Sequence, residues 1–231
     1  MVYYKDVNTH TAFNMPEGIT VVAVTKTFPF TTVFDAYKRG FRHIGENRVD
    51  EADGKIEKAK AQNLHHIVWH MIGHVQSRKA SDTARLFDWV DSVDTVEVAQ
   101  KLDAEAGLIG RKLHILLEVN LSGEQSKFGF DVQDWSENGE KVDMLTGKIN
   151  RILSFPHIAV EGLMTMAPYV TNPETNRPIF RSMKRLSSSI RAQIPSFGMQ
   201  LSMGTSCDWR VAIEEGATMV RLGEVLFGPR T

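Results

Sequence analysis

The chain contains a single cysteine, Cys207, among its 231 residues. An internal disulfide is therefore impossible, and such cysteine usage is typical of a reducing compartment. No apolar run reaches the roughly 20 residues of a membrane-spanning helix, and the N-terminus lacks the apolar core of a signal peptide. The sequence thus predicts a cytoplasmic protein without a membrane partner.

A strong charge of one sign is also missing. The formal net charge is −1, from 27 Lys and Arg against 28 Asp and Glu, and the basic residues form no block. Because nucleic-acid-binding proteins carry a basic footprint, we expect no nucleic acid partner. With 42% hydrophobic and 24% charged residues, the chain has an ordinary globular composition and can bury a full core. We predict one domain over residues 1–231.

What the sequence does contain is an alternation of strand-like and helix-like segments. Residues 19–25 form a continuous β-branched run, which is typical of a strand buried on both faces. Seven further strands are expected at residues 41–45, 66–72, 89–93, 113–120, 158–164, 199–202 and 218–222. Helical patterns follow at residues 31–39, 47–62, 74–87, 96–106, up to about 153, 180–194 and 208–216.

Eight alternating units with no Ser/Pro-rich linker favour a single (β/α)8 barrel, the TIM barrel of the α/β class. The competing architecture is an open, doubly wound parallel sheet. That fold commonly carries a GxGxxG turn after its first strand, and this sequence has none there. We therefore predict the closed barrel.

The ends of the last two expected strands have features of a phosphate site. The segment Ser202–Ser206 is a hydroxyl- and glycine-rich turn that enters a helix, with Asp208 available as N-cap and Gly216 as C-terminal stop. Free N–H groups and the helix dipole at such a turn suit an anion. The final strand ends in Arg221 and Gly223, where barrel enzymes commonly bind phosphate. Read alone, these residues are equally well explained as turns and helix caps.

Lys26 stands at the end of the first expected strand, which neighbours the eighth in a closed barrel. A lysine there forms a Schiff base with an aldehyde when desolvation or nearby positive charge lowers its pKa. Arg221 is placed to supply such a charge. Alone, Lys26 would be read as a solvated lysine at a strand end. Together with the phosphate turn and Arg221, it predicts a binding site for pyridoxal 5′-phosphate.

Six segments of the chain resemble the pyridoxal phosphate homeostasis proteins, the YggS-like family. They are AVTKTFP from Ala23, IGENRVDE from Ile44, WHMIGHVQSRK from Trp69, VNLSGEQSKFGF from Val119, GLMTMAP from Gly162, and the closing LSMG, VRLG and LFG. They occur in the right order and cover nearly the whole chain. The resemblance implies the alanine racemase-like barrel of fold-type III pyridoxal phosphate proteins.

The resemblance also implies roles for individual residues. Lys26 matches the Schiff-base lysine, Arg221 the arginine that faces the pyridine nitrogen, and Asn47 a position near the cofactor. The residues that match the phosphate cradle are Ser202, Gly204, Thr205, Ser206, Gly223 and Glu224. The sequence departs from the family at Thr205, where Met is frequent, and in having Cys207 and Trp209 in that loop. The hydroxyls and the glycine remain, so phosphate binding is still expected.

The expected chemistry is limited. A protonated arginine cannot accept a proton from the pyridine nitrogen, so the ring is a weak electron sink and transamination and decarboxylation are disfavoured. The resemblance implies that alanine racemases add a β domain with a tyrosine acid/base. We expect this chain, which ends at Thr231, to lack that domain and one of the two bases of racemisation.

The resemblance accordingly implies a carrier and regulator of the vitamin B6 pool. We expect a monomer, with apoenzymes and amino acids as partners besides pyridoxal 5′-phosphate. No residue is assigned a catalytic role. The alternative is a pyridoxal phosphate-dependent amino-acid racemase or lyase of modest activity, so the sequence does not decide whether the protein is an enzyme.

Two other groups of polar residues give weaker evidence for a functional site. His70 and His74 are four apart, but no nearby glutamate completes a zinc signature, so we expect no metal. Glu118, Asn120 and Lys127 either contact the ligand at the barrel mouth or pair with one another in solvent.

Overall fold

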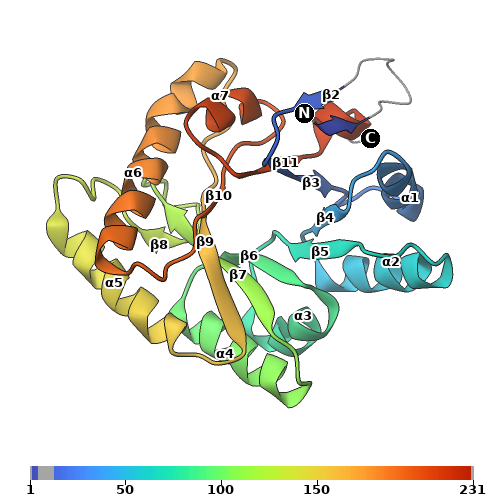
Figure 1. Cartoon of the computed structure of the whole chain (residues 1–231), viewed down its shortest axis with the longest axis horizontal. Helices are drawn as coiled ribbons and strands as arrows, with labels where there is room; N and C mark the ends of the chain where they lie inside the picture. The colour runs from blue at the N-terminus through green and yellow to red at the C-terminus, as the bar shows by residue number, and fades with distance from the viewer. Residues whose placement is uncertain (1, 5–12, 230–231) are drawn as a thin grey trace.

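The computed structural model describes residues 2–4 and 13–229. Its centre is a closed barrel of eight parallel strands in the order β6-β5-β4-β3-β11-β10-β9-β7, closed by pairing of β6 with β7 (Figure 1). The strands are β3 (Thr20–Val24), β4 (His43–Glu46), β5 (Val68–Met71), β6 (Trp89–Val93), β7 (Leu113–Asn120), β9 (Ile158–Met164), β10 (Gln200–Ser202) and β11 (Met219–Leu222). The predicted (β/α)8 barrel is confirmed, and each of its strands lies where the sequence placed one.

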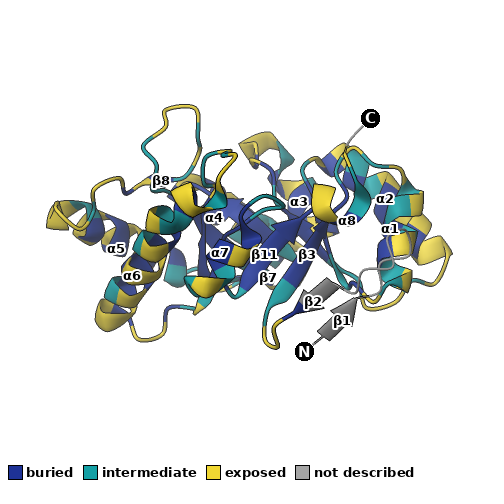
Figure 2. Ribbon diagram, turned by 90° about the horizontal axis from the view of Figure 1, so that it is seen from above, coloured by how far each residue is buried: buried dark blue, intermediate teal, exposed yellow. Residues whose placement is uncertain are grey.

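Helices surround the strands and turn their buried faces toward them (Figures 1 and 2). They are α1 (Phe30–Lys38), α2 (Val49–Ala61), α3 (Ala80–Leu86), α4 (Val96–Leu108), α5 (Gly139–Leu153), α6 (Arg177–Gln193), α7 (Trp209–Glu214) and α8 (Glu224–Phe227), with 3-10 turns η1 (Ser77–Lys79) and η2 (Pro173–Asn176). In α6, Phe180, Met183, Leu186 and Ile190 are buried at helical spacing, as the sequence pattern predicted. No helix in the described ranges is long and apolar enough to cross a membrane.

Within the described residues, three short strands lie outside the barrel and were not predicted. β1 (Val2–Tyr4) pairs antiparallel with β2 (Phe13–Met15), and β8 (Phe130–Asp131) pairs with the end of β7. Strands of two or three residues show too little of the two-residue alternation to be recognised in a sequence.

The helix expected from His74 begins later, as η1 at Ser77. Tertiary contacts hold the preceding residues in a non-helical loop. The His74 ring stacks on Phe128 with centroids 4.0 Å apart, and its Nδ1 lies 2.9 Å from Asp94 Oδ2. Val75 is buried in the main core. These contacts prevail over the helical pattern of the segment.

The hydrophobic core has two parts. The larger cluster joins the helices to the outer face of the strands. A smaller one consists of Val22, Leu116, Met164 and Met219, four residues from four barrel strands, packed against Ile72 and Trp89. Because side chains alternate along a strand, these residues face the interior while their neighbours face the helices. The interior is thus filled, and the carboxyl ends of the strands remain for a site.

Candidate cofactor site

A pocket of about 650 Å³ opens at the carboxyl ends of the barrel strands. Seven of the nine predicted site residues line it: Lys26, Asn47, Thr205, Ser206, Arg221, Gly223 and Glu224. These residues lie within or just after β3, β4, β10 and β11. The structure therefore brings together segments that are up to about 200 residues apart in the chain, at the face where barrel enzymes have their sites.

Lys26 and Arg221 come together through strand pairing. β11 runs parallel to β3, with Arg221 opposite Val22 and Leu222 opposite Ala23. The expectation that the first and eighth barrel strands are neighbours is confirmed. Both strands end at the same face, so the lysine after one and the arginine near the end of the other line the same pocket.

The Arg221 side chain is buried and held in one direction. Its Nη1 donates to Ser202 Oγ at 2.6 Å, and Nη2 donates to the Thr165 carbonyl at 2.9 Å and lies 3.0 Å from Met166 Sδ. Ser202 itself is fully buried and is not among the lining residues. Its hydroxyl accepts from the arginine and so helps to orient it. The predicted contact of Ser202 with a phosphate stays a prediction.

Buried acids compensate the charge of Arg221. Burial lowers the pKa of the guanidinium, while the charges of Asp91, Glu118 and Asp208 raise it. Because arginine begins with so high a pKa, it remains a cation in this setting. Burial also raises the pKa of Glu118 to about 7, with Asp94 adding to the effect and Arg221 opposing it.

The turn after β10 is shaped by Gly204 and Asp208. Gly204 has φ +91°, and a Cβ there would lie 2.6 Å from Ala212 Cβ in α7, so glycine is required for this close approach. Asp208 occupies the N-cap position of α7 as predicted, but its side chain makes no capping hydrogen bond to the helix. Its Oδ1 instead accepts from the Thr205 N–H at 2.7 Å, which removes that donor from the pocket. Gly216, with φ +95°, follows the end of α7 as predicted.

Two backbone donors of the turn after β11 converge on Ser206. Gly223 N donates to Ser206 Oγ at 3.2 Å and Val225 N at 3.3 Å. The N–H groups of Ser206 and Glu224 donate to no acceptor within the described part of the chain. Hydroxyl and N–H groups that converge in this way form a donor set suited to an oxyanion such as phosphate.

Asn47 enters the pocket with an unsatisfied polar atom. Its Oδ1 is buried and accepts no hydrogen bond from residues 2–4 or 13–229. A buried acceptor without a donor costs about 1–3 kcal/mol, so its retention calls for a functional explanation. Its backbone is fitted closely against Gly73, where a Cβ would lie 2.4 Å from the Asn47 carbonyl oxygen.

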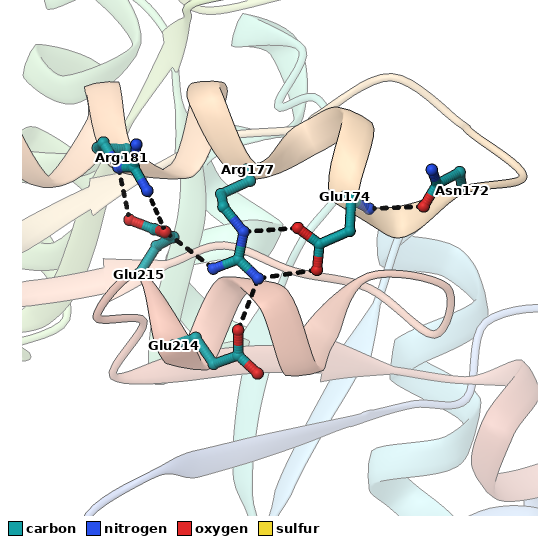
Figure 3. A network of polar contacts seen from close by, with 6 residues as sticks. All are labelled: Asn172, Glu174, Arg177, Arg181, Glu214 and Glu215. Atoms are coloured by element: carbon teal, nitrogen blue, oxygen red, sulfur yellow. Dashed lines mark hydrogen bonds and ion pairs between the residues drawn. The ribbon is translucent and has the colours of Figure 1, made fainter.

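Helix α7, which follows the Ser202–Ser206 turn, is fastened to α6 and η2 at both ends. At its start, Asn176 Nδ2 donates to Asp208 Oδ2 at 2.8 Å. At its end, Arg177 binds Glu214 and Glu215, at 2.6 and 2.9 Å (Figure 3). Exposed ion pairs contribute little singly, but a network with a shared arginine holds geometry better. The turn therefore rests on a firmly placed helix.

Some lining residues were not predicted as site residues, although each lies at the end of a predicted strand or in the loop after it. They are Val24, Ile72, Met166, Tyr169, Cys207, Val225 and Pro229. Tyr169 is 87% exposed, and Cys207 Sγ lies 3.4 Å from Thr205 Oγ1. Their position at the carboxyl ends of strands, or in the loops that follow, was the available signal. By contrast, Glu118, Asn120 and Lys127 do not line the pocket, and Lys127 pairs with Glu124 at 3.0 Å.

A histidine pair lies deeper in the barrel. His43 Nδ1 is 2.9 Å from His70 Nε2, and His70 Nδ1 is 2.9 Å from Asp91 Oδ1. Burial lowers the pKa of His43 to about 4, His70 adds to the effect, and Asp91 opposes it. The folded protein thus keeps His43 neutral where an unfolded chain, with a histidine pKa of about 6.5, takes up a proton. This contribution to stability is complete above about pH 6.5 and is lost as the pH falls toward 4.

We therefore expect His43→Asn to flatten the pH dependence of unfolding. Relative to the variant, the wild type should lose about 1.4 kcal/mol per pH unit below about pH 6.5, or roughly 3 kcal/mol in all. Urea denaturation at a series of pH values measures this difference. The comparison cancels the contribution of Glu118, whose raised pKa acts in the opposite direction. Exposed His65→Asn is the control, and parallel curves for wild type and His43→Asn would contradict the assignment.

The chain is similar in sequence to proteins of one known family over most of its length. A family model described as "Alanine racemase, N-terminal domain" matches residues 8–231. A pyridoxal phosphate homeostasis protein of Vibrio alginolyticus is 35% identical over 216 residues, which are 93% of this chain and 88% of that protein. One from Pseudomonas aeruginosa is 36% identical over 217 residues, 93% of this chain and 86% of that protein.

Solved structures with the same fold include a relative of similar length and a longer enzyme. PipY of Synechococcus elongatus PCC7942, solved with PLP bound, has a TM-score of 0.81 and 32% identity, covering 93% of this chain and 95% of that chain. An alanine racemase of Clostridium difficile 630 has a TM-score of 0.70 and 18% identity, covering 93% of this chain and 56% of that chain. At such low identity, the second likeness shows the fold alone.

Proposed function

The chain belongs to the family of pyridoxal phosphate homeostasis proteins, and from this premise we propose that it holds pyridoxal 5′-phosphate on Lys26 and serves as a carrier and regulator of that cofactor. One observation carries the proposal. A single pocket unites a lysine, a buried arginine and converging N–H donors, the three kinds of group that this cofactor requires.

The residues fit the cofactor by their chemistry. When bound, the cofactor supplies an aldehyde that condenses with a primary amine and releases water. Lys26 provides the amine, and the Ser206 hydroxyl with the backbone N–H groups of Gly223 and Glu224 provides the phosphate donors. The Thr205 hydroxyl, which donates to Asp208 Oδ1 at 3.1 Å, joins them by turning from that carboxylate to the phosphate. We further propose that Asn47, whose side-chain oxygen lacks a donor, contacts the ligand.

Arg221 then determines what the site does with the cofactor. Its guanidinium, fixed by Ser202 and Thr165, keeps a positive charge beside the ring and accepts no proton from it. Gly204 gives the phosphate turn its path without lining the pocket, and Ser202 acts through Arg221. We propose that the protein stores and delivers the cofactor to apoenzymes rather than driving rapid chemistry on amino acids.

The alternative function, an amino-acid racemase or lyase of modest activity, would use Tyr169 as a catalytic residue. Its phenol lines the pocket and is a candidate second acid/base. Its side chain is 87% exposed, so solvent surrounds the ring and its hydroxyl. Efficient proton transfer needs a positioned group, and nothing described holds this one in place. The tyrosine therefore supports the alternative only weakly.

We expect loaded protein to produce little or no racemisation, transamination or decarboxylation of added L-amino acids. Rates should fall far below the roughly 1–1000 per second of dedicated enzymes. Chiral chromatography after long incubation, together with α-proton exchange in D₂O, measures this. Turnover of several per second on any amino acid, lost in Tyr169→Phe, would establish the alternative function.

Domain organisation, oligomeric state and location complete the proposed function. We propose that residues 1–231 form one cofactor-binding domain that acts as a monomer. A free thiol at Cys207 suits a reducing compartment, which supports a cytoplasmic location.

A further inference from the structure

Lys55 is a buried lysine on α2, a helix otherwise rich in exposed Lys and Glu. Its side chain is 7% exposed, and its Nζ donates three short hydrogen bonds. The acceptors are the Thr25 carbonyl at 2.7 Å, Glu46 Oε1 at 2.7 Å and Glu51 Oε1 at 2.6 Å. A buried ammonium is tolerated only when it is paired and hydrogen-bonded, and here all three of its protons have acceptors.

The hydrogen-bond network around Lys55 reaches both sequence neighbours of the pocket lysine, Lys26. Thr25 directly precedes Lys26, and its hydroxyl donates to Glu46 Oε1 at 2.5 Å. Thr27 directly follows Lys26, and its N–H donates to Glu51 Oε1 at 2.6 Å. Both neighbours of Lys26 are therefore tied to the same network.

Thr27 is held in an unfavourable backbone conformation. Its φ is +66°, in the left-handed region that a β-branched residue rarely adopts. Such a conformation persists only where the surroundings fix it. The Glu51 carboxylate does this by accepting the Thr27 N–H, and Lys55 in turn fixes the carboxylate.

We propose that Lys55 and Glu51 are positioning residues that hold the backbone on both sides of Lys26 so that its amine meets the cofactor aldehyde. This inference rests on the proposed function. The network leaves the phosphate donors and Arg221 untouched, because these come from β10, β11 and the turns that follow them. It should therefore govern covalent capture and not phosphate binding.

Pyridoxamine 5′-phosphate separates this role from a purely structural one. It carries the same ring and phosphate but an amine in place of the aldehyde, so it forms no Schiff base with lysine. Loss of positioning should weaken binding of pyridoxal 5′-phosphate alone. Loss of fold would weaken binding of both compounds.

The test is a matched pair at Glu51. Glu51→Ala removes the acceptor of Thr27 and Lys55, whereas Glu51→Gln keeps an oxygen in its place. We expect Glu51→Ala to weaken pyridoxal 5′-phosphate binding about tenfold to a hundredfold and to reduce borohydride labelling of Lys26, with pyridoxamine 5′-phosphate affinity unchanged. Glu51→Gln should recover most of the affinity, and exposed Glu57→Ala should match the wild type.

Lys55→Met should show the same selective loss of pyridoxal 5′-phosphate affinity that is expected of Glu51→Ala. If Glu51→Ala does not fold, Glu51→Asp takes its place, because its shorter side chain holds the carboxylate farther from the Thr27 N–H. Equal weakening of both compounds, or of neither, overturns the positioning role. The wild-type arm tests the proposed function separately, because it must bind pyridoxal 5′-phosphate and label at Lys26 whatever the variants do.

Discussion

Borohydride reduction of the protein loaded with pyridoxal 5′-phosphate should attach the cofactor to one peptide, the one that contains Lys26. Lys26 lines the pocket with Arg221 and the phosphate turn, whereas no other lysine of residues 13–229 lines it. Mass spectrometry of a digest identifies the modified residue. In Lys26→Ala the covalent label and the Schiff-base absorption band should both disappear, the largest effect expected of any single substitution here.

Binding should survive that substitution in weaker form. The phosphate donors remain in Lys26→Ala, so non-covalent affinity should be retained in part. Exposed Lys112→Ala, at the amino end of β7 on the opposite side of the barrel, is the matched control and should label as the wild type does. Labelling of another lysine in the wild type, with Lys26 unmodified, would show the assignment to be wrong.

Pyridoxal without its phosphate should bind far more weakly than pyridoxal 5′-phosphate. Each hydrogen bond to a charged group is worth roughly 1.5–3 kcal/mol, so losing two of them lowers affinity about 10²–10⁴-fold. Spectral titration with both compounds measures the ratio. Gly223→Asp, which sets a carboxylate against the phosphate, should nearly abolish binding of the phosphorylated compound.

Two further variants sharpen this result. Ser206→Ala removes one hydroxyl and should cost about tenfold in affinity. Gly139→Asp adds the same charge at an open position at the start of α5 and should bind normally. Equal affinity of the wild type for pyridoxal and its phosphate would refute the proposed position of the phosphate.

The barrel could be predicted because local chemistry and global fold agree along most of the chain. β-Branched runs such as residues 19–25 are buried on both faces, and Gly216 ends its helix as the sequence indicated. The meeting of Lys26 with Arg221 followed from barrel closure alone. One residue-level departure, at His74, occurred where a ring stack and an ion pair outweighed a helical pattern.

The details that sequence could not supply depend on side-chain direction and on convergence of distant elements. Ser202 follows the pattern of a phosphate turn, but its place on β10 directs its hydroxyl to Arg221. Lys55 looks like any solvated lysine of a charged helix, and only the fold brings Glu46 and Thr25 to it. Local pattern carries no information about such partners.

The hydrogen bonds that end on Ser206 Oγ have a consequence for the kinetics of capture. Before a ligand arrives, the N–H groups of Gly223 and Val225 are already directed at one oxygen. An incoming phosphate exchanges one acceptor for another and does not have to order a loose loop, so little conformational entropy is lost on association. Recognition of the phosphate should accordingly be fast, and the slower event should be formation of the bond to Lys26. The cofactor would then bind first in a reversible, non-covalent complex, and only a fraction of these complexes would go on to form the covalent bond before the cofactor dissociates.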